Sequence, residues 1–233
     1  MKLKLLGLMG ALCLSACADP YVATPYDRAA SQVDRMVIMD DAMPEKAIAY
    51  EVASVGSNFG LIGALVDAGI QAERQDAVND ALREVSFDAE GELETLLMRE
   101  IGQEGYEVAL LPSGARAKRD WLPAHSGAPE GVDAYLDVAV IEYGYMSPGA
   151  GQPFRPYVWA KVKLVGAADG SLLMENQIVY NPLNVVEGVI TIPPNPEFFF
   201  NNRSALLADK ARLAAGIEDA LQRVAETSAQ LLR

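Results

Sequence analysis

Histidine and cysteine are almost absent from this chain, which has one histidine and 2 cysteines among its 233 residues. Zinc sites are built from clusters of these two residues, and proton relays in enzymes most often use histidine. The single histidine, His125, lies in a segment rich in proline and glycine, where a relay would rest on a flexible loop. We therefore expect no metal site, no cofactor and no histidine-based catalysis.

Other catalytic motifs are absent as well. The chain has no G-x-S-x-G elbow, no S-x-x-K pair and no glycine-rich phosphate loop. Two carboxylate pairs could be offered instead, Glu142 with Asp137 and Asp40 with Asp41, but such pairs arise by chance in a chain with 32 acidic residues. We expect a protein that is not an enzyme, and a hydrolase of cell-wall sugars that uses Glu142 and Asp137 is the catalytic alternative.

Basic residues are few, with 19 lysines and arginines against 32 acidic residues and a net charge of −13. This balance excludes nucleic acid as a partner, because phosphate binding needs a basic surface. The local exception is a cluster of Arg116, Lys118 and Arg119. The cluster has two interpretations, a solvated loop or a contact with an anion such as a lipid headgroup or a cell-wall polymer.

The first seventeen residues have the order of a bacterial export signal. Lys2 and Lys4 precede an apolar run at residues 5–14, which at about ten residues is too short to span a bilayer. The following quartet, Leu-Ser-Ala-Cys at residues 14–17, resembles the lipobox of bacterial lipoproteins. That resemblance implies cleavage before Cys17 and attachment of lipid, palmitate included, to its sulfur. An ordinary secretory signal with a chance cysteine is the alternative.

The expected organisation follows from this signal. Residues 1–16 would be the signal peptide, residues 17–33 a lipidated tether, and residues 34–233 a single periplasmic domain. Cys13 leaves with the signal and lipid consumes the thiol of Cys17, so the mature protein has no disulfide. Asp19 lies one place beyond the position associated with inner-membrane retention. We therefore expect the outer membrane rather than the inner one.

Hydrophobic periodicity predicts an α+β fold with a mostly antiparallel sheet, helices on one face and a long C-terminal helix. Strands are expected near residues 35–39, 46–54 and 106–111, and three stronger ones at 134–145, 157–165 and 172–180 form an antiparallel meander with one wet face. Helices are expected from about 58 to 84, after the cap Asp88, and from 204 to 232. Residues 113–131 are expected to form a surface loop.

Residues 55–70 are nearly free of charge and carry glycines at 56, 60, 63 and 69. The stretch is too short for a membrane helix, and Asp67 would be costly inside a bilayer. Close packing of a helix on its own sheet is the interpretation we favour, and contact with a partner or another copy is the alternative.

Several short sequence motifs occur in the same order as in a group of uncharacterised bacterial envelope lipoproteins. They are the lipobox, GLIGALVDA (60–68), the pair Gly105-Tyr106, DAYLDVAV (133–140) and DGSLL (169–173). The domains of that group resemble the N-terminal domain of TolB and the periplasmic domain of CsgG. The resemblance covers residues 60–180 and implies a non-catalytic envelope protein. No propeller repeats follow, which excludes TolB itself.

Three adjacent phenylalanines, Phe198, Phe199 and Phe200, are the candidate contact with a partner. They cannot all face inward from one strand or helix, so a binding patch competes with a loop folded back onto the final helix. We expect a lipid-anchored accessory or binding component of an envelope assembly, held on the membrane by its anchor and docked on an unidentified envelope protein. Self-assembly into a CsgG-like homo-oligomer stays open.

Overall fold

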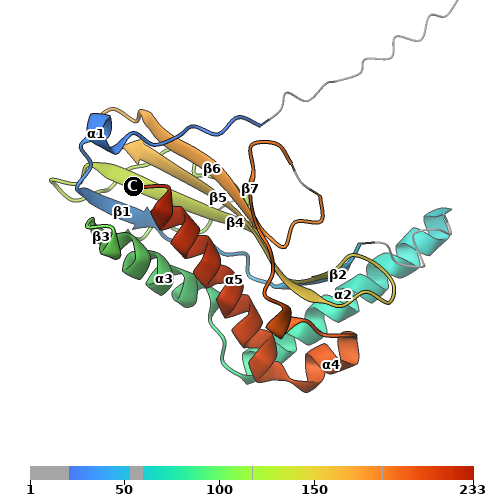
Figure 1. The fold of residues 1–233 in the computed structure, drawn as a ribbon. Helices are drawn as coiled ribbons and strands as arrows, with labels where there is room; N and C mark the ends of the chain where they lie inside the picture. The colour runs from blue at the N-terminus through green and yellow to red at the C-terminus, as the bar shows by residue number, and fades with distance from the viewer. Residues whose placement is uncertain (1–20, 53–59, 117, 185) are drawn as a thin grey trace, which may run out of the picture.

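The computed structural model describes residues 21–52, 60–116, 118–184 and 186–233, with backbone only for residues 60–71. Cys17, the expected lipid site, lies outside the described residues, as do residues 55–59 and the side chains of residues 60–70. The fold is α+β, as predicted, with a sheet and a long C-terminal helix packed against it (Figure 1).

Seven strands form one sheet, in the order β3-β1-β4-β5-β6-β7, with β2 paired to β4 beside β1. The strands are β1 (Arg35–Met39), β2 (Ile48–Glu51), β3 (Glu107–Leu111), β4 (Ala134–Ser147), β5 (Arg155–Gly166), β6 (Leu172–Tyr180) and β7 (Ile190–Ile192). β4 is long enough for β1 to pair with its first half and β2 with its second half.

The sheet is mixed, and the prediction of a mostly antiparallel sheet is wrong outside its centre. The meander β4–β5–β6 is antiparallel as expected, but β1, β2, β3 and β7 all join in parallel. β3 returns beside β1 after two helices, and such a crossover is what parallel pairing requires. Short edge strands carry no sequence signal for direction, so periodicity alone could not reveal this.

Two helices, α3 (Ala89–Gln103) and α5 (Lys210–Gln230), pack side by side on one face of the sheet (Figure 1). Asp88 caps α3 as predicted, accepting a hydrogen bond from the backbone NH of Gly91. The remaining helices are α1 (Arg28–Ser31), α2 (Gly60–Glu84), the 3-10 turn η2 (Pro196–Phe198) and α4 (Arg203–Ala208). The predicted C-terminal helix is thus two helices, α4 and α5, separated at Asp209.

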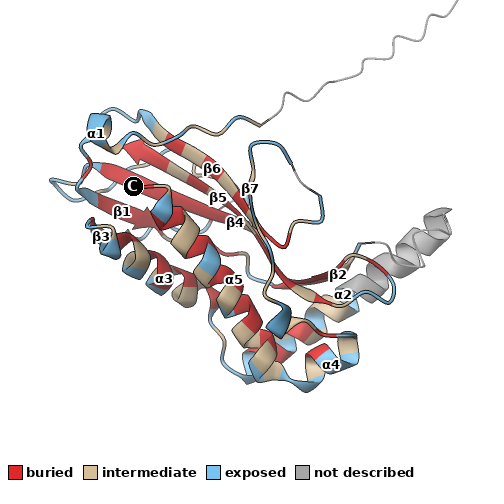
Figure 2. Ribbon diagram, in the orientation of Figure 1, coloured by how far each residue is buried: buried red, intermediate tan, exposed pale blue. Residues whose placement is uncertain are grey.

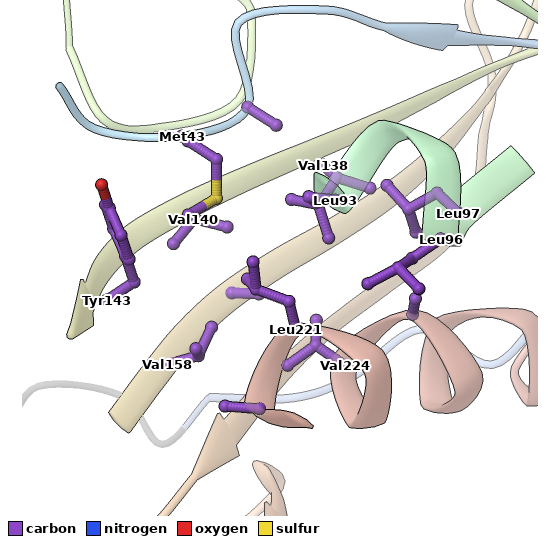
Figure 3. Packing of buried hydrophobic residues seen from close by; sticks show 14 of the residues in the cluster. Met43, Leu93, Leu96, Leu97, Val138, Val140, Tyr143, Val158, Leu221 and Val224 are labelled. Atoms are coloured by element: carbon purple, nitrogen blue, oxygen red, sulfur yellow. The ribbon is translucent and has the colours of Figure 1, made fainter. Parts of the chain in front are cut away.

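The main core lies between this sheet face and the two helices (Figures 2 and 3). Leu93 and Leu97 of α3 and Leu221 and Val224 of α5 are fully buried there against Val138 of β4. Both helices present apolar residues at three- and four-residue steps, as a helix covering a sheet should.

The opposite face of the sheet is not simply wet, contrary to expectation. Val37, Met39 and Tyr135 are buried on that face under the segment 112–133, which packs Leu122 and Val132 against them. The 14 residues of β4 are therefore buried or half-buried on both faces.

Candidate functional site

The three candidate phenylalanines are folded back onto the protein. Phe200 is 2% exposed and contacts Tyr145 edge-to-face, with ring centroids 5.5 Å apart. Its backbone pairs with Phe154 through hydrogen bonds of 2.8 and 2.9 Å. Phe198 packs on α5 at Gly216. A Cβ atom added at Gly216 would lie 2.9 Å from the Phe198 Cβ, which is too close, so this contact requires glycine at position 216.

Arginines cover the remaining ring faces of this cluster. The guanidinium of Arg212 lies 4.5 Å from the ring centroid of Phe200, and that of Arg155 lies 5.1 Å from that of Phe199. Arg212 also donates hydrogen bonds to the carbonyl oxygens of Glu197 and Phe199. Phe198 and Phe199 are half-buried, so the three phenylalanines pack between the start of β5 and α5 and do not form a free docking patch.

The basic cluster at residues 116–119 is bound internally. Arg116 donates to the Asp137 carboxylate at 2.6 Å and to the carbonyl oxygens of Asp40 and Asp41. Arg119 donates to the Asp41 carboxylate at 3.0 Å and to the Met43 carbonyl at 2.6 Å. Both arginines are therefore taken up by acceptors of this chain, and the interpretations of a solvated loop and of an anion contact hold for neither. Lys118 alone is exposed.

Asp137 is the centre of this arrangement. It is fully buried, and its second carboxylate oxygen is 2.7 Å from the backbone NH of Leu122 and 2.8 Å from Nε2 of His125. The His125 side chain is 9% exposed and rests on the ring of Tyr135. His125 is thus held by a buried partner, and the expectation of a flexible position is wrong.

The two carboxylate pairs considered from the sequence do not form a hydrolase site. Asp40 accepts from the Ser113 hydroxyl at 2.6 Å, and Asp41 is bound to the arginines, so both anchor the segment 112–133. Asp137 and Glu142 oppose Lys163 and Trp159, four residues apart on β5. That spacing is about 13 Å along a strand, beyond the roughly 5–9.5 Å between the carboxylates of glycoside hydrolases.

No group of three or more histidine, cysteine, aspartate or glutamate side chains could hold a metal ion among the residues whose placement is described. Within the same residues, no helix has both the length and the apolar character needed to cross a bilayer.

A hollow of about 350 Å³ lies on the sheet face opposite to α3 and α5, which we call the outer sheet face. Its floor is formed by Tyr157, Trp159, Gln177 and Val179 of β5 and β6, and its wall by the loop between β6 and β7. Trp159 Nε1 donates to the Gln177 side chain at 3.2 Å. We call this feature the outer hollow. It is mostly apolar with a few polar groups, as binding sites in proteins commonly are.

Glu142 lies beside the outer hollow at a β-bulge of β4, opposite Trp159. Burial raises the pKa of Glu142 above its usual value. Burial, with a smaller contribution from Glu142, raises the pKa of the Tyr157 hydroxyl to about 12. Glu142 is thus a half-buried acid on the strand next to the one that carries Trp159.

Trp121, the second tryptophan, covers the same sheet face nearer to Asp137. The Lys163 and Lys161 ammonium groups lie 4.0 and 4.8 Å from its ring centroid. Asp120 pairs with Lys161 at 3.0 Å, and Glu175 pairs with Lys163 at 3.4 Å. The sequence did not single out either tryptophan, although Trp159 and the two lysines alternate along β5 on one face.

The segment that precedes the domain is paired to the sheet. Thr24 exchanges two backbone hydrogen bonds with Glu175 of β6, at 2.8 and 3.0 Å (Figure 1). The carbonyl of Tyr21 lies against Gly188 so closely that a side chain at Gly188 would collide with it. The expected tether is thus fixed to the β6 edge from residue 21 onward.

Comparisons with known proteins place this chain in no family, since no family model and no curated protein matches it. Several solved structures are distantly similar, among them the following three. A Xanthomonas campestris protein of the family model DUF330 is 15% identical with a TM-score of 0.36, over 59% of this chain and 57% of its own. This chain therefore spans little more than half of that protein.

PelC of Paraburkholderia phytofirmans, solved as a dodecamer in two crystal forms, is similar over more of the chain. The first form, of a point variant, is 10% identical with a TM-score of 0.39, over 91% of this chain and 96% of its own. The second is 14% identical with a TM-score of 0.34, over 86% and 94%. Similarities at this distance do not say what this chain does, and the resemblance to TolB and CsgG domains stays a prediction.

Proposed function

We propose that the protein is a lipoprotein anchored through Cys17, facing the periplasm from the outer membrane and acting by binding rather than by catalysis. The observation that carries the proposal is the signal itself, a charged start, a short apolar run and the quartet Leu-Ser-Ala-Cys at residues 14–17. Several acyl chains on one residue would give stable membrane attachment.

The described surface supports binding over chemistry. Asp137 is fully buried and is hydrogen-bonded to the largely covered side chain of His125, the single histidine. The outer hollow, by contrast, is open and combines aromatic and aliphatic walls with Gln177 and Glu142 nearby. An envelope partner docked on this face, rather than on Phe198–Phe200, is the interaction that the geometry favours.

The anchor is tested by mass spectrometry of the protein extracted from envelopes. The expected N-terminal fragment starts at Cys17 and carries diacylglycerol and an amide-linked acyl chain, while Cys17→Ala leaves an unmodified, soluble form. Separation of inner and outer membranes tests the location. An unlipidated mature N-terminus would refute the anchor, and recovery with the inner membrane would refute the location.

The hollow is tested by crosslinking in intact cells from a photoreactive residue at position 159. Crosslinks to one envelope protein are expected there, and none from the same residue at Arg99, which lies on α3 on the far side of the sheet. Equal crosslinking from both positions would remove the outer hollow as the docking site.

A further inference from the structure

The place where the chain leaves the folded body is fixed by residues 21–24. Thr24 is paired with β6, and Tyr21 lies against Gly188, in the loop that joins β6 to β7. Burial raises the pKa of the Tyr21 hydroxyl to about 12, with a smaller contribution from Glu175. The leading chain therefore adheres to this edge of the protein, and it reaches the lipid site from there.

Only three residues lie between Cys17 and Tyr21, so the two Cα atoms are four residue steps apart. Even a fully extended chain of that length spans at most about 14 Å. The headgroup layer on each side of a bilayer is itself about 5–8 Å deep. An anchor at Cys17 therefore holds the Tyr21 edge at the membrane surface, whatever orientation the rest of the protein prefers.

Exposed apolar side chains occur at this edge. Val22 is 77% exposed, and Val186 and Leu183 of the neighbouring loop are 53% and 36% exposed. Val186 begins a turn closed by a hydrogen bond to its carbonyl from the NH of Val189, two residues from the Tyr21 contact at Gly188. We call Val22, Leu183 and Val186 the apolar edge, and Leu183 and Val186 also line the rim of the outer hollow.

We propose that the apolar edge lies in the headgroup layer of the membrane and sets the orientation of the whole domain. This inference rests on the lipid anchor proposed above. The apolar edge contacts lipid in this proposal, because the chain between Cys17 and Tyr21 is so short that the membrane holding the anchor must lie next to this edge. The protein is strongly acidic, and Glu187 directly follows Val186, so contact with lipid is confined to a small edge of apolar side chains. Oriented in this way, the outer hollow opens beside the bilayer.

The experiment uses the lipidated protein in phosphatidylcholine vesicles. The mature chain has no free thiol once Cys17 carries lipid, so Val186→Cys or Leu183→Cys adds a single site for a polarity-sensitive dye. Val85→Cys is the matched control, an exposed valine, 40% accessible, at the end of α2. Vesicles with brominated acyl chains should quench the dye at 186 and at 183 several-fold more than the dye at 85.

Two results would overturn the proposal, one by refuting the orientation and the other by refuting the anchor. If the protein floats with the vesicles but the dyes at 186 and 183 are quenched no more than the dye at 85, the anchor stands and the orientation is wrong. If the protein does not float and Cys17 carries no lipid, the anchor fails and the orientation loses its basis.

Discussion

Asp137 is a residue whose importance rests on burial rather than on reactivity. Its carboxylate has no contact with solvent and receives hydrogen bonds from Arg116, from His125 and from the backbone NH of Leu122. All three partners belong to the segment 112–133, so one aspartate on β4 fixes the cover of the outer sheet face. A buried carboxylate needs such partners, because an unpaired charge in the interior is costly.

Asp137→Asn should therefore destabilise the protein by about 3–5 kcal/mol, since it leaves the buried Arg116 guanidinium without its counter-charge. Lys118→Met is the control, because Lys118 is exposed in the same segment and its loss should change stability by less than about 0.5 kcal/mol. Urea unfolding followed by circular dichroism measures both. Equal stability of the two variants would show that the buried pair does not hold the segment.

Glu142 provides a test of pH dependence. Burial raises its pKa in the folded protein, so the folded state holds the proton more tightly than the unfolded chain does. The contribution of Glu142 to the free energy of unfolding is therefore most favourable at a pH below its pKa in the unfolded chain. That contribution is lost as the pH rises through its pKa in the folded protein. Ionised Glu142 weakens the folded state at neutral pH.

Glu142→Gln should accordingly be more stable than the parent at pH 7, and the difference should disappear near pH 4. Glu187→Gln, in an exposed loop, is the control and should show no such change. Thermal unfolding across pH 4 to 7 gives the comparison. A Gln variant that gained stability equally at both ends of the range would refute ionisation as the cause.

Among the secondary-structure elements, the break between α4 and α5 has a local cause. Asp209 ends α4 and caps α5, accepting a hydrogen bond from the backbone NH of Arg212 at 3.1 Å. Asp209→Ala should cost about 0.5–2 kcal/mol, the usual loss for such a cap. Glu218→Ala, in the middle of α5, should cost less than about 0.5 kcal/mol. Chemical denaturation compares them, and equal losses would remove the capping role.

Most elements could be predicted from local pattern, and the exceptions share a physical reason. The strands β4 and β5 and the cap at Asp88 follow from local signals, and the structure confirms them, although β4 is buried on both faces and only β5 alternates. The parallel pairing of β1 and β3 is decided by the helices between them, and β7 is too short to show a pattern. The split at Asp209 was missed because apolar spacing continues through it.

The candidate sites were harder to predict because burial changes the meaning of a charge. The sequence around Arg116 predicts a solvated loop residue. In the structure Arg116 is buried, because it contacts Asp137 and Asp40, which lie 21 and 76 positions away in the chain. Trp121 gave no periodic signal of a site, since it reaches Lys161 and Lys163 only when its loop folds over the sheet. Phe200 was predicted as a candidate contact or a buried residue, and the structure shows it buried.

Over the whole molecule, the described core is complete within one chain. α3 and α5 cover one sheet face, the segment 112–133 covers part of the other, and the exposed large apolar residues are few. A stable interface between protein copies buries roughly 1,200–2,000 Å² and usually has an apolar centre. Outside the apolar edge and the outer hollow, the described side chains do not offer such a centre.

The soluble Cys17→Ala protein should therefore have the mass of one chain in solution, and the lipidated form in mild detergent should be a monomer or a complex with unrelated proteins. Size exclusion with light scattering measures both forms. A discrete ring-sized oligomer of the soluble form would contradict the accessory function and would make residues 55–70 the first candidate for the contact between copies. An oligomer of the lipidated form alone would instead implicate the apolar edge, because the anchor and that edge lie together at the membrane.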